Sequence, residues 1–204
     1  MFTALLVGTL LLAQGTDATT SVQNRVEQRI ENRVEVRTNV QEVLQEAREA
    51  RVEARENLRL QLTQIKDERK QQIVESAMER IQSMNDRWVA HWENVLERLA
   101  GILDKVEIRA DESSLSATDK LSIEALISSA RDAIAAASMS VNTQASKVYN
   151  IEITDESTLG SNMKAVMAQL RDDTRNVIED INVARKAVAE VLSALKSMLP
   201  TLSS

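Results

Sequence analysis

Apolar residues recur along this chain at alternating steps of three and four, which is the spacing of one face of an α-helix. The longest run starts at Leu159 and continues to Met198, and a second extends from Ile123 to Val148. A third run consists of Val74, Ala77, Ile81, Met84, Trp88, Trp92, Val95, Leu99, Ile102 and Val106. Each run predicts a long helix with one apolar seam of the coiled-coil kind.

Polar residues between these runs predict where the helices begin and end. We expect the first helix to continue unbroken from about Thr20 to Arg109, until residues 111–114 interrupt it with acids and serines. Ser116 and Asp119 have the spacing of a capping box, which predicts the start of a second helix that ends near Lys147.

Residues 149–153 alternate between apolar and polar side chains, as in a short extended connector. Acids and a serine at 155–157 then predict the start of a third helix, which ends at Pro200. With short connections, long helices pack as antiparallel neighbours. We therefore expect an all-α fold: an elongated antiparallel three-helix bundle with a long charged amino-terminal helical extension.

Residues 22–62 carry an unusual arrangement of charge. Val26, Ile30 and Val34 are each preceded by an arginine and followed by a glutamate, whereas Ala50 and Ala54 have these flanks exchanged. Residues four apart are neighbours on a helix, so like charges stack on their own kind, which is mildly unfavourable in an isolated helix. A basic ridge and an acidic ridge are expected beside a weak apolar strip.

One interpretation of these ridges is a self-complementary seam. If two copies crossed antiparallel near Val43, the ridge of Arg25, Arg29 and Arg33 would face the ridge of Glu49 and Glu53 of the partner. The partner would then be a second copy of the chain, bound through residues 22–62. The alternative is a solvated helical spacer between a membrane and the bundle, and the two interpretations are compatible.

The composition narrows the classes of function. After the first eighteen residues only Gly101, Gly160 and Pro200 interrupt regular backbone, and aromatic residues are 2% of the chain. This composition predicts a thin aliphatic core with little room for an active site built from loops. The net charge is −6, and we expect no face to collect basic residues without acids beside them, which argues against a nucleic-acid partner.

The absence of cysteine from the sequence excludes disulfides, and a lone histidine makes an all-protein catalytic metal site difficult to build. The carboxylates follow no catalytic or metal-binding motif. We expect no cofactor, no metal ion and no enzymatic activity.

The start of the chain resembles an export signal. Ala4 to Ala13 is an apolar run that is too short to span a bilayer, and small residues follow it. No Lys or Arg precedes this run, so an uncleaved anchor or a buried helix are alternatives. We expect an exported protein of the cell envelope or the extracellular space, with residues 1–18 as leader or anchor, 19–62 as the extension and 63–204 as the bundle.

Trp88, His91 and Trp92 share one helix face because they are three and four residues apart. They could form an aromatic ligand site, or His91 could respond to pH. The alternative is that both tryptophans fill the core, because they lie on the apolar seam, with the imidazole at its edge.

A resemblance to a class of helical proteins rests on three segments that precede Ala-rich helices: Glu68-Arg69-Lys70, Arg87-Trp88 and Leu96-Glu97-Arg98-Leu99. With them the chain resembles uncharacterised exported helical proteins of uncultivated small-genome bacteria. The resemblance implies a helical fold and export, and it implies no activity.

These observations predict a non-enzymatic structural or interaction protein of the cell envelope that acts through helix–helix association. One alternative is a binding module that holds a small apolar or lipid ligand between helices. Another is an extracytoplasmic signalling or chaperone-like helical domain whose extension holds a client protein.

Overall fold

The computed structural model of the chain describes residues 10–153 and 155–199. Within these residues the protein is all-helical and has no strand. The elements are α1 (Leu10–Leu62), α2 (Glu68–Glu112), α3 (Ala117–Ala145), the short 3-10 helix η1 (Glu156–Thr158) and α4 (Leu159–Met198). The all-α class expected from the sequence is therefore confirmed.

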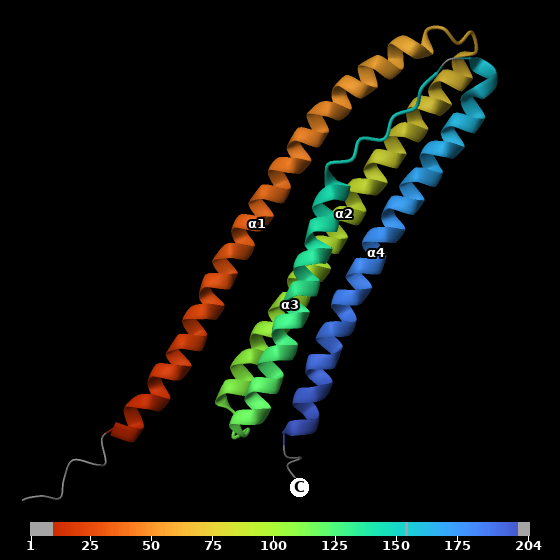
Figure 1. Cartoon of the computed structure of the whole chain (residues 1–204). Coiled ribbons are helices and arrows are strands. Elements are labelled where there is room, and N and C mark those ends of the chain that lie inside the picture. Colours follow the sequence, from red (N-terminus) through yellow and green to blue (C-terminus); the bar gives the residue numbers. More distant parts are fainter. Residues whose placement is uncertain (1–9, 154, 200–204) are drawn as a thin grey trace, which may run out of the picture.

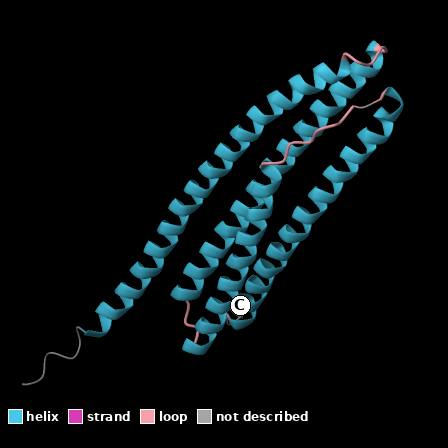
Figure 2. Cartoon of the chain, turned by 45° about the horizontal axis from the view of Figure 1, so that its top comes forward, coloured by secondary structure: helices cyan, strands magenta, loops and turns pink. Residues whose placement is uncertain are grey.

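The four α-helices lie lengthwise beside one another, and successive helices run in opposite directions (Figures 1 and 2). As a result α2 and α4 are parallel, whereas α1 and α3 run against them. Among the described residues, the backbones of α2, α3 and α4 lie close to one another pairwise, and the backbone of α1 lies close to α2 and α3 but not to α4. One side of α2 is thus covered by α1, while its other side adjoins α4.

The expectation of one unbroken helix from Thr20 to Arg109 is wrong. α1 ends at Leu62, residues 63–67 reverse the chain, and α2 runs back along α1. The carboxylate of Asp67 caps α2 by accepting hydrogen bonds from two backbone amides of its first turn, at 2.9 and 3.3 Å. Burial of Leu62 and Ile65, each 3% exposed, holds the turn against the bundle.

The later helix boundaries agree closely with the sequence. Ser116 caps α3: its hydroxyl accepts from the backbone amide of Asp119 at 3.1 Å and donates to the Asp119 carboxylate at 2.7 Å. α3 ends at Ala145, near the expected Lys147, and α4 ends at Met198. The expected terminator Pro200 lies outside the described residues.

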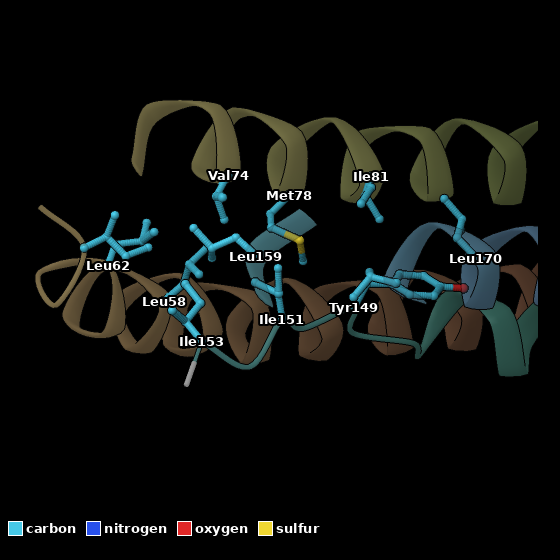
Figure 3. Packing of buried hydrophobic residues seen from close by; sticks show 12 residues of the cluster. Leu58, Leu62, Val74, Met78, Ile81, Tyr149, Ile151, Ile153, Leu159 and Leu170 are labelled. Carbon is cyan, nitrogen blue, oxygen red and sulfur yellow. The ribbon is translucent and has the colours of Figure 1, made fainter. Parts of the chain in front are cut away.

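The segment between α3 and η1 is the extended connector that the sequence predicts. Tyr149, Ile151 and Ile153 are buried, while Asn150 and Glu152 between them are exposed. Buried side chains from α1, α2, the connector and α4 point toward one another there (Figure 3). The connector thus replaces α3 in the core at the end of the bundle where α1 turns into α2.

The buried stripe of α2 agrees with the predicted seam only in part, since Val74, Ile81, Trp92 and Val106 are buried as expected. Met78, Val89, Leu96 and Leu103 are buried, each one position after a predicted seam residue. Ala77, Val95 and Ile102 are only partly buried, and Trp88 is 36% exposed. One residue is a rotation of about 100° around a helix, and this rotation is toward α1. Because α1 covers α2 from that side, the partly exposed residues of the predicted seam lie at the surface of α2 beside α4. We call this strip of α2, which includes Ala77 and Trp88, the shoulder.

Gly101 lies in the interior of α2, and a methyl group added there would contact nothing within 4 Å. Gly101→Ala should raise the free energy of unfolding by about 0.5–1 kcal/mol, because glycine has a lower helix propensity than alanine. Urea denaturation measures the change. Gly160→Ala, in the first turn of α4, is the matched control with a smaller expected gain. A loss of stability from Gly101→Ala would contradict the packing of α2.

Candidate functional site

A ladder of ion pairs joins α1 to α2. Arg51 pairs with Asp86 at 2.5 Å, Arg55 pairs with Glu79, and a third pair joins Arg59 to Glu75 at 2.8 Å. The arginines are four residues apart, so they lie on one side of α1, and their partners follow in reverse order along α2. We call these three pairs the α1–α2 ladder.

A second ionic cluster lies further along the same helices. Glu107 of α2 accepts from Arg29 of α1 and also from Arg131 of α3, the latter at 2.7 Å. Arg131 also pairs with Asp104, which is 5% exposed, at 3.0 Å. Arg29 belongs to the basic ridge expected from the sequence, and the structure places it in a contact within its own chain.

The other residues of the expected seam are distributed differently. The side chains of Arg25 and Arg33 lie outside the described residues. Glu49 is exposed and accepts from the amide of Gln45 at 3.3 Å, and Glu53 is exposed as well. Val43, the expected crossing point of two copies, packs against a cluster of α2, α3 and α4 in its own chain.

A chain of buried polar side chains links the helices where α3 meets the connector. Gln144 donates through its amide to Asn85 at 2.6 Å and to the Tyr149 hydroxyl at 2.7 Å. Tyr149 in turn donates to Asp173 of α4 at 2.9 Å, and Lys147 pairs with the same carboxylate at 2.5 Å. Asn85 and Gln144 are at most 1% exposed, so each depends on the other to satisfy its polar atoms.

Arg51 connects this polar chain to the α1–α2 ladder. It donates to the backbone carbonyls of Ala145 and Lys147, at 3.5 and 3.4 Å, where α3 ends. Burial raises the pKa of the Tyr149 phenol well above its ordinary range, and the hydrogen bond to Asp173 adds to this effect. The arrangement fixes how α1, α3 and α4 sit relative to one another, which is a structural role.

The aromatic cluster is divided between core and surface. The Trp88 and Trp92 rings have centroids 6.2 Å apart and are tilted by 33°. Trp92 is buried, Trp88 is 36% exposed, and His91 is exposed. The core interpretation therefore fits Trp92, whereas Trp88 lies on the shoulder between α2 and α4.

An open groove runs along this shoulder between α2 and α4. It has a volume of about 590 Å³, and Ile73, Met84 and Met167 supply apolar lining. Arg69 and Arg80 also line the groove, and no acidic residue does. The groove between α1 and α2, of about 730 Å³, contrasts with it because its arginines face the acids of the ladder.

The sequence analysis missed a basic edge that continues this lining along α2. It consists of Arg69, Arg80, Arg87, Arg98 and Arg109, all exposed. Steps of seven and eleven residues return to nearly the same side of an α-helix, and only such steps separate these arginines. The expectation that no face collects basic residues without acids therefore fails from Arg69 to Arg98, whereas Arg109 has Glu112 three residues after it on the same side. Within the described part of the chain, none of the five forms an ion pair.

None of the helices in the described part of the chain combines the length and the apolar character needed to cross a membrane. No group of three or more metal-ligating side chains is assembled among the described residues. Comparison of the chain with protein-family models, with curated proteins and with solved structures gives no match.

The ion pairs of the α1–α2 ladder should differ in how much each contributes to the free energy of unfolding. Arg51→Met removes a side chain that is 10% exposed and leaves Asp86 and two carbonyls without their donor, so the free energy of unfolding should fall by about 1–3 kcal/mol. Arg55→Met breaks a pair in which both side chains are 48% exposed and should cost about 0–1 kcal/mol. Urea denaturation compares the two, and equal losses would contradict a special role for Arg51.

Tyr149 should make the fold sensitive to alkali. Because the pKa of its phenol is raised in the folded state, the unfolded chain loses this proton first as the pH rises past about 10, and stability then falls. Tyr149→Phe should be less stable at neutral pH, because Gln144 and Asp173 lose a partner, but its decline above pH 10 should be smaller. Urea midpoints across this pH range test both effects, and parallel declines would contradict the burial of the phenol.

Proposed function

We propose that the protein is a non-enzymatic structural or interaction protein of the cell envelope that acts through helix–helix association. The observation that carries the proposal is the outward face of α1. This face holds an acidic ridge that consists of Glu42, Glu46, Glu49, Glu53 and Glu56. All five glutamates are exposed.

Nothing within the described residues neutralises the acidic ridge, since none of the five glutamates forms an ion pair there. Neighbours such as Glu49 and Glu53 are four residues apart, and such like-charge pairs destabilise a helix. Arg51, Arg55 and Arg59 of α1, in contrast, pair with acids of α2. The arginines on one side of α1 are thus neutralised by acids of the same molecule. The glutamates on the other side stay charged and accessible to a partner.

The acidic ridge is also partly apolar. Leu60 follows Glu56 by four residues on this side of α1 and is 68% exposed. Val52 is 59% exposed but is rotated toward the arginines, and both side chains also line the groove between α1 and α2. Charged positions beside apolar ones are the composition of a helix face that pairs with another helix. This supports helix–helix association as the function and a second copy of the chain as the partner.

Two further parts of the proposal rest on the sequence and on the helix contacts. The envelope location rests on the apolar run Ala4 to Ala13. We also propose that α2, α3 and α4 form the expected three-helix bundle, since these helices contact one another pairwise. α1 is then an added helix that presents the acidic ridge.

An α1–α1 seam centred on Val43 would first require α1 to leave its own bundle, whereas the acidic ridge is accessible in the folded chain.

Light scattering coupled to size-exclusion chromatography tests the proposal on the full chain. At low ionic strength the mass should exceed the 22.7 kDa monomer, rise with concentration and fall as salt screens exposed charges. The variant Glu49→Gln/Glu53→Gln should associate more weakly.

Glu179→Gln/Glu190→Gln is the matched control, because it removes two exposed glutamates from α4 and should leave the mass unchanged. A monomer at every concentration and salt level would overturn the proposal.

A further inference from the structure

We infer that the acidic ridge of one copy docks into the α2–α4 groove of a second copy. This inference rests on the proposed function and names the surface that receives α1. The groove is apolar along its lining and basic at its edge, and the ridge is acidic with the exposed side chain of Leu60 in line with it. The two surfaces are therefore complementary in both charge and hydrophobicity.

The α4 side of the groove has the same character as the α2 side. Met167 lines the groove, and Arg171, Ile178 and Arg185 follow it at steps that return to this side of α4. Ile178 is 46% exposed, and both arginines are exposed. Met167 thus lines the groove from α4, and the basic and apolar positions that follow it extend the same face of α4 beyond the groove. The groove lining itself includes no acid.

The charges of α1 and α2 alternate in layers across the molecule. The acidic ridge is followed by the arginines of the ladder, then by Glu75, Glu79 and Asp86, and finally by the basic edge of α2. The internal contact between α1 and α2 brings a basic side against an acidic side. A second copy placed on the basic edge with its acidic ridge would repeat that contact between molecules.

The spacing of the two surfaces supports this pairing. Glu49 and Glu56 are seven residues apart, as are Arg80 and Arg87, and Glu42 and Glu53 are eleven residues apart, as are Arg69 and Arg80. Seven residues are two helical turns, about 10 Å, so successive carboxylates can meet successive guanidinium groups along parallel or antiparallel helices. In such a contact Leu60 would lie over the apolar lining of the groove.

The donor and acceptor surfaces lie on different parts of one molecule. Within the described residues the backbone of α1 does not come close to α4, and the groove lies between α2 and α4. A copy that docks its acidic ridge therefore leaves its own groove open to another copy. Such a heterologous contact does not close at a dimer unless its rotation forms a ring. The expected assembly extends beyond two copies.

Nucleic acid would match the basic edge but not the rest of the groove. A phosphate backbone pairs with arginine, whereas Ile73, Met84 and Met167 offer it nothing, and the chain carries a net charge of −6. The acidic and partly apolar face of α1 matches both the basic edge and the apolar lining of the groove. Binding to a nucleic-acid duplex is therefore an outcome that the test must be able to reveal.

Charge reversal on each surface tests the pairing in the full chain. The ridge variant Glu49→Lys/Glu53→Lys gives two basic surfaces, and the groove variant Arg69→Glu/Arg80→Glu gives two acidic ones. Each variant alone should lose about tenfold or more in self-association affinity, because like charges then oppose each other. An equimolar mixture should regain it, because the ridge of each variant is complementary to the groove of the other.

Light scattering of the wild type, the single variants and the mixture gives the result, and circular dichroism verifies that each variant is folded. Glu179→Lys/Glu190→Lys and Arg131→Lys serve as controls outside both surfaces and should associate like the wild type. A mixture that stays monomeric would overturn the pairing of these two surfaces. A wild type that never associates would instead overturn the proposed function itself.

Two outcomes would show that the groove has another occupant. If the groove variant associates like the wild type, the α2–α4 groove does not receive α1, while the proposed association stands. If the wild type binds a DNA duplex and the groove variant loses only that binding, the basic edge serves nucleic acid. Either result would overturn the inference.

Discussion

The ionic contact between α1 and α2 determines how the rest of the bundle is exposed. Because Arg51, Arg55 and Arg59 meet acids along α2, α1 covers one side of that helix. α2 consequently buries Met78 and Val89, and leaves the residues just before them, Ala77 and Trp88, on the shoulder beside α4. The groove and the outward acidic ridge are thus two consequences of one contact. If α1 projected away from the bundle, the ladder and the basic edge would not alternate across the molecule.

The buried polar chain keeps this arrangement in a single register. Apolar seams can slide along one another by a heptad at modest cost, whereas Asn85 and Gln144 satisfy each other only in one alignment. Tyr149 and Asp173 extend the same constraint from the connector to α4. Arg51 then ties the α1–α2 ladder to the end of α3 through two carbonyl groups. The outer surfaces are therefore presented by helices whose relative positions are fixed from inside.

Local patterns in the sequence account for α3, the connector and α4, but not for the turn between α1 and α2. Ile123 and Leu170 are buried where their spacing places them, and Ser116 caps α3 as expected. Residues 63–66 are compatible with helix, so their reversal depends on the burial of Ile65 by distant elements, which no local pattern contains. The basic edge of α2 could not be recognised from neighbouring residues in the sequence for another reason. Arg80, Arg87 and Arg98 each follow an acid in the sequence, yet a neighbour in sequence is about 100° away around the helix.

The internal and the proposed external contacts use the same charges but differ in what supports them. Inside the molecule, α1 is tethered by a short turn and buries Leu58, Leu62 and Ile65, so its ion pairs add to an apolar contact at high effective concentration. Between molecules, the large apolar side chain that the acidic ridge could bury is Leu60, and the charges of the ridge are exposed and screened over about 8 Å at physiological salt. As the salt concentration rises, the copies should therefore separate from one another well before α1 detaches from its own bundle. The proposed assembly would then form and separate while the folded unit stays intact.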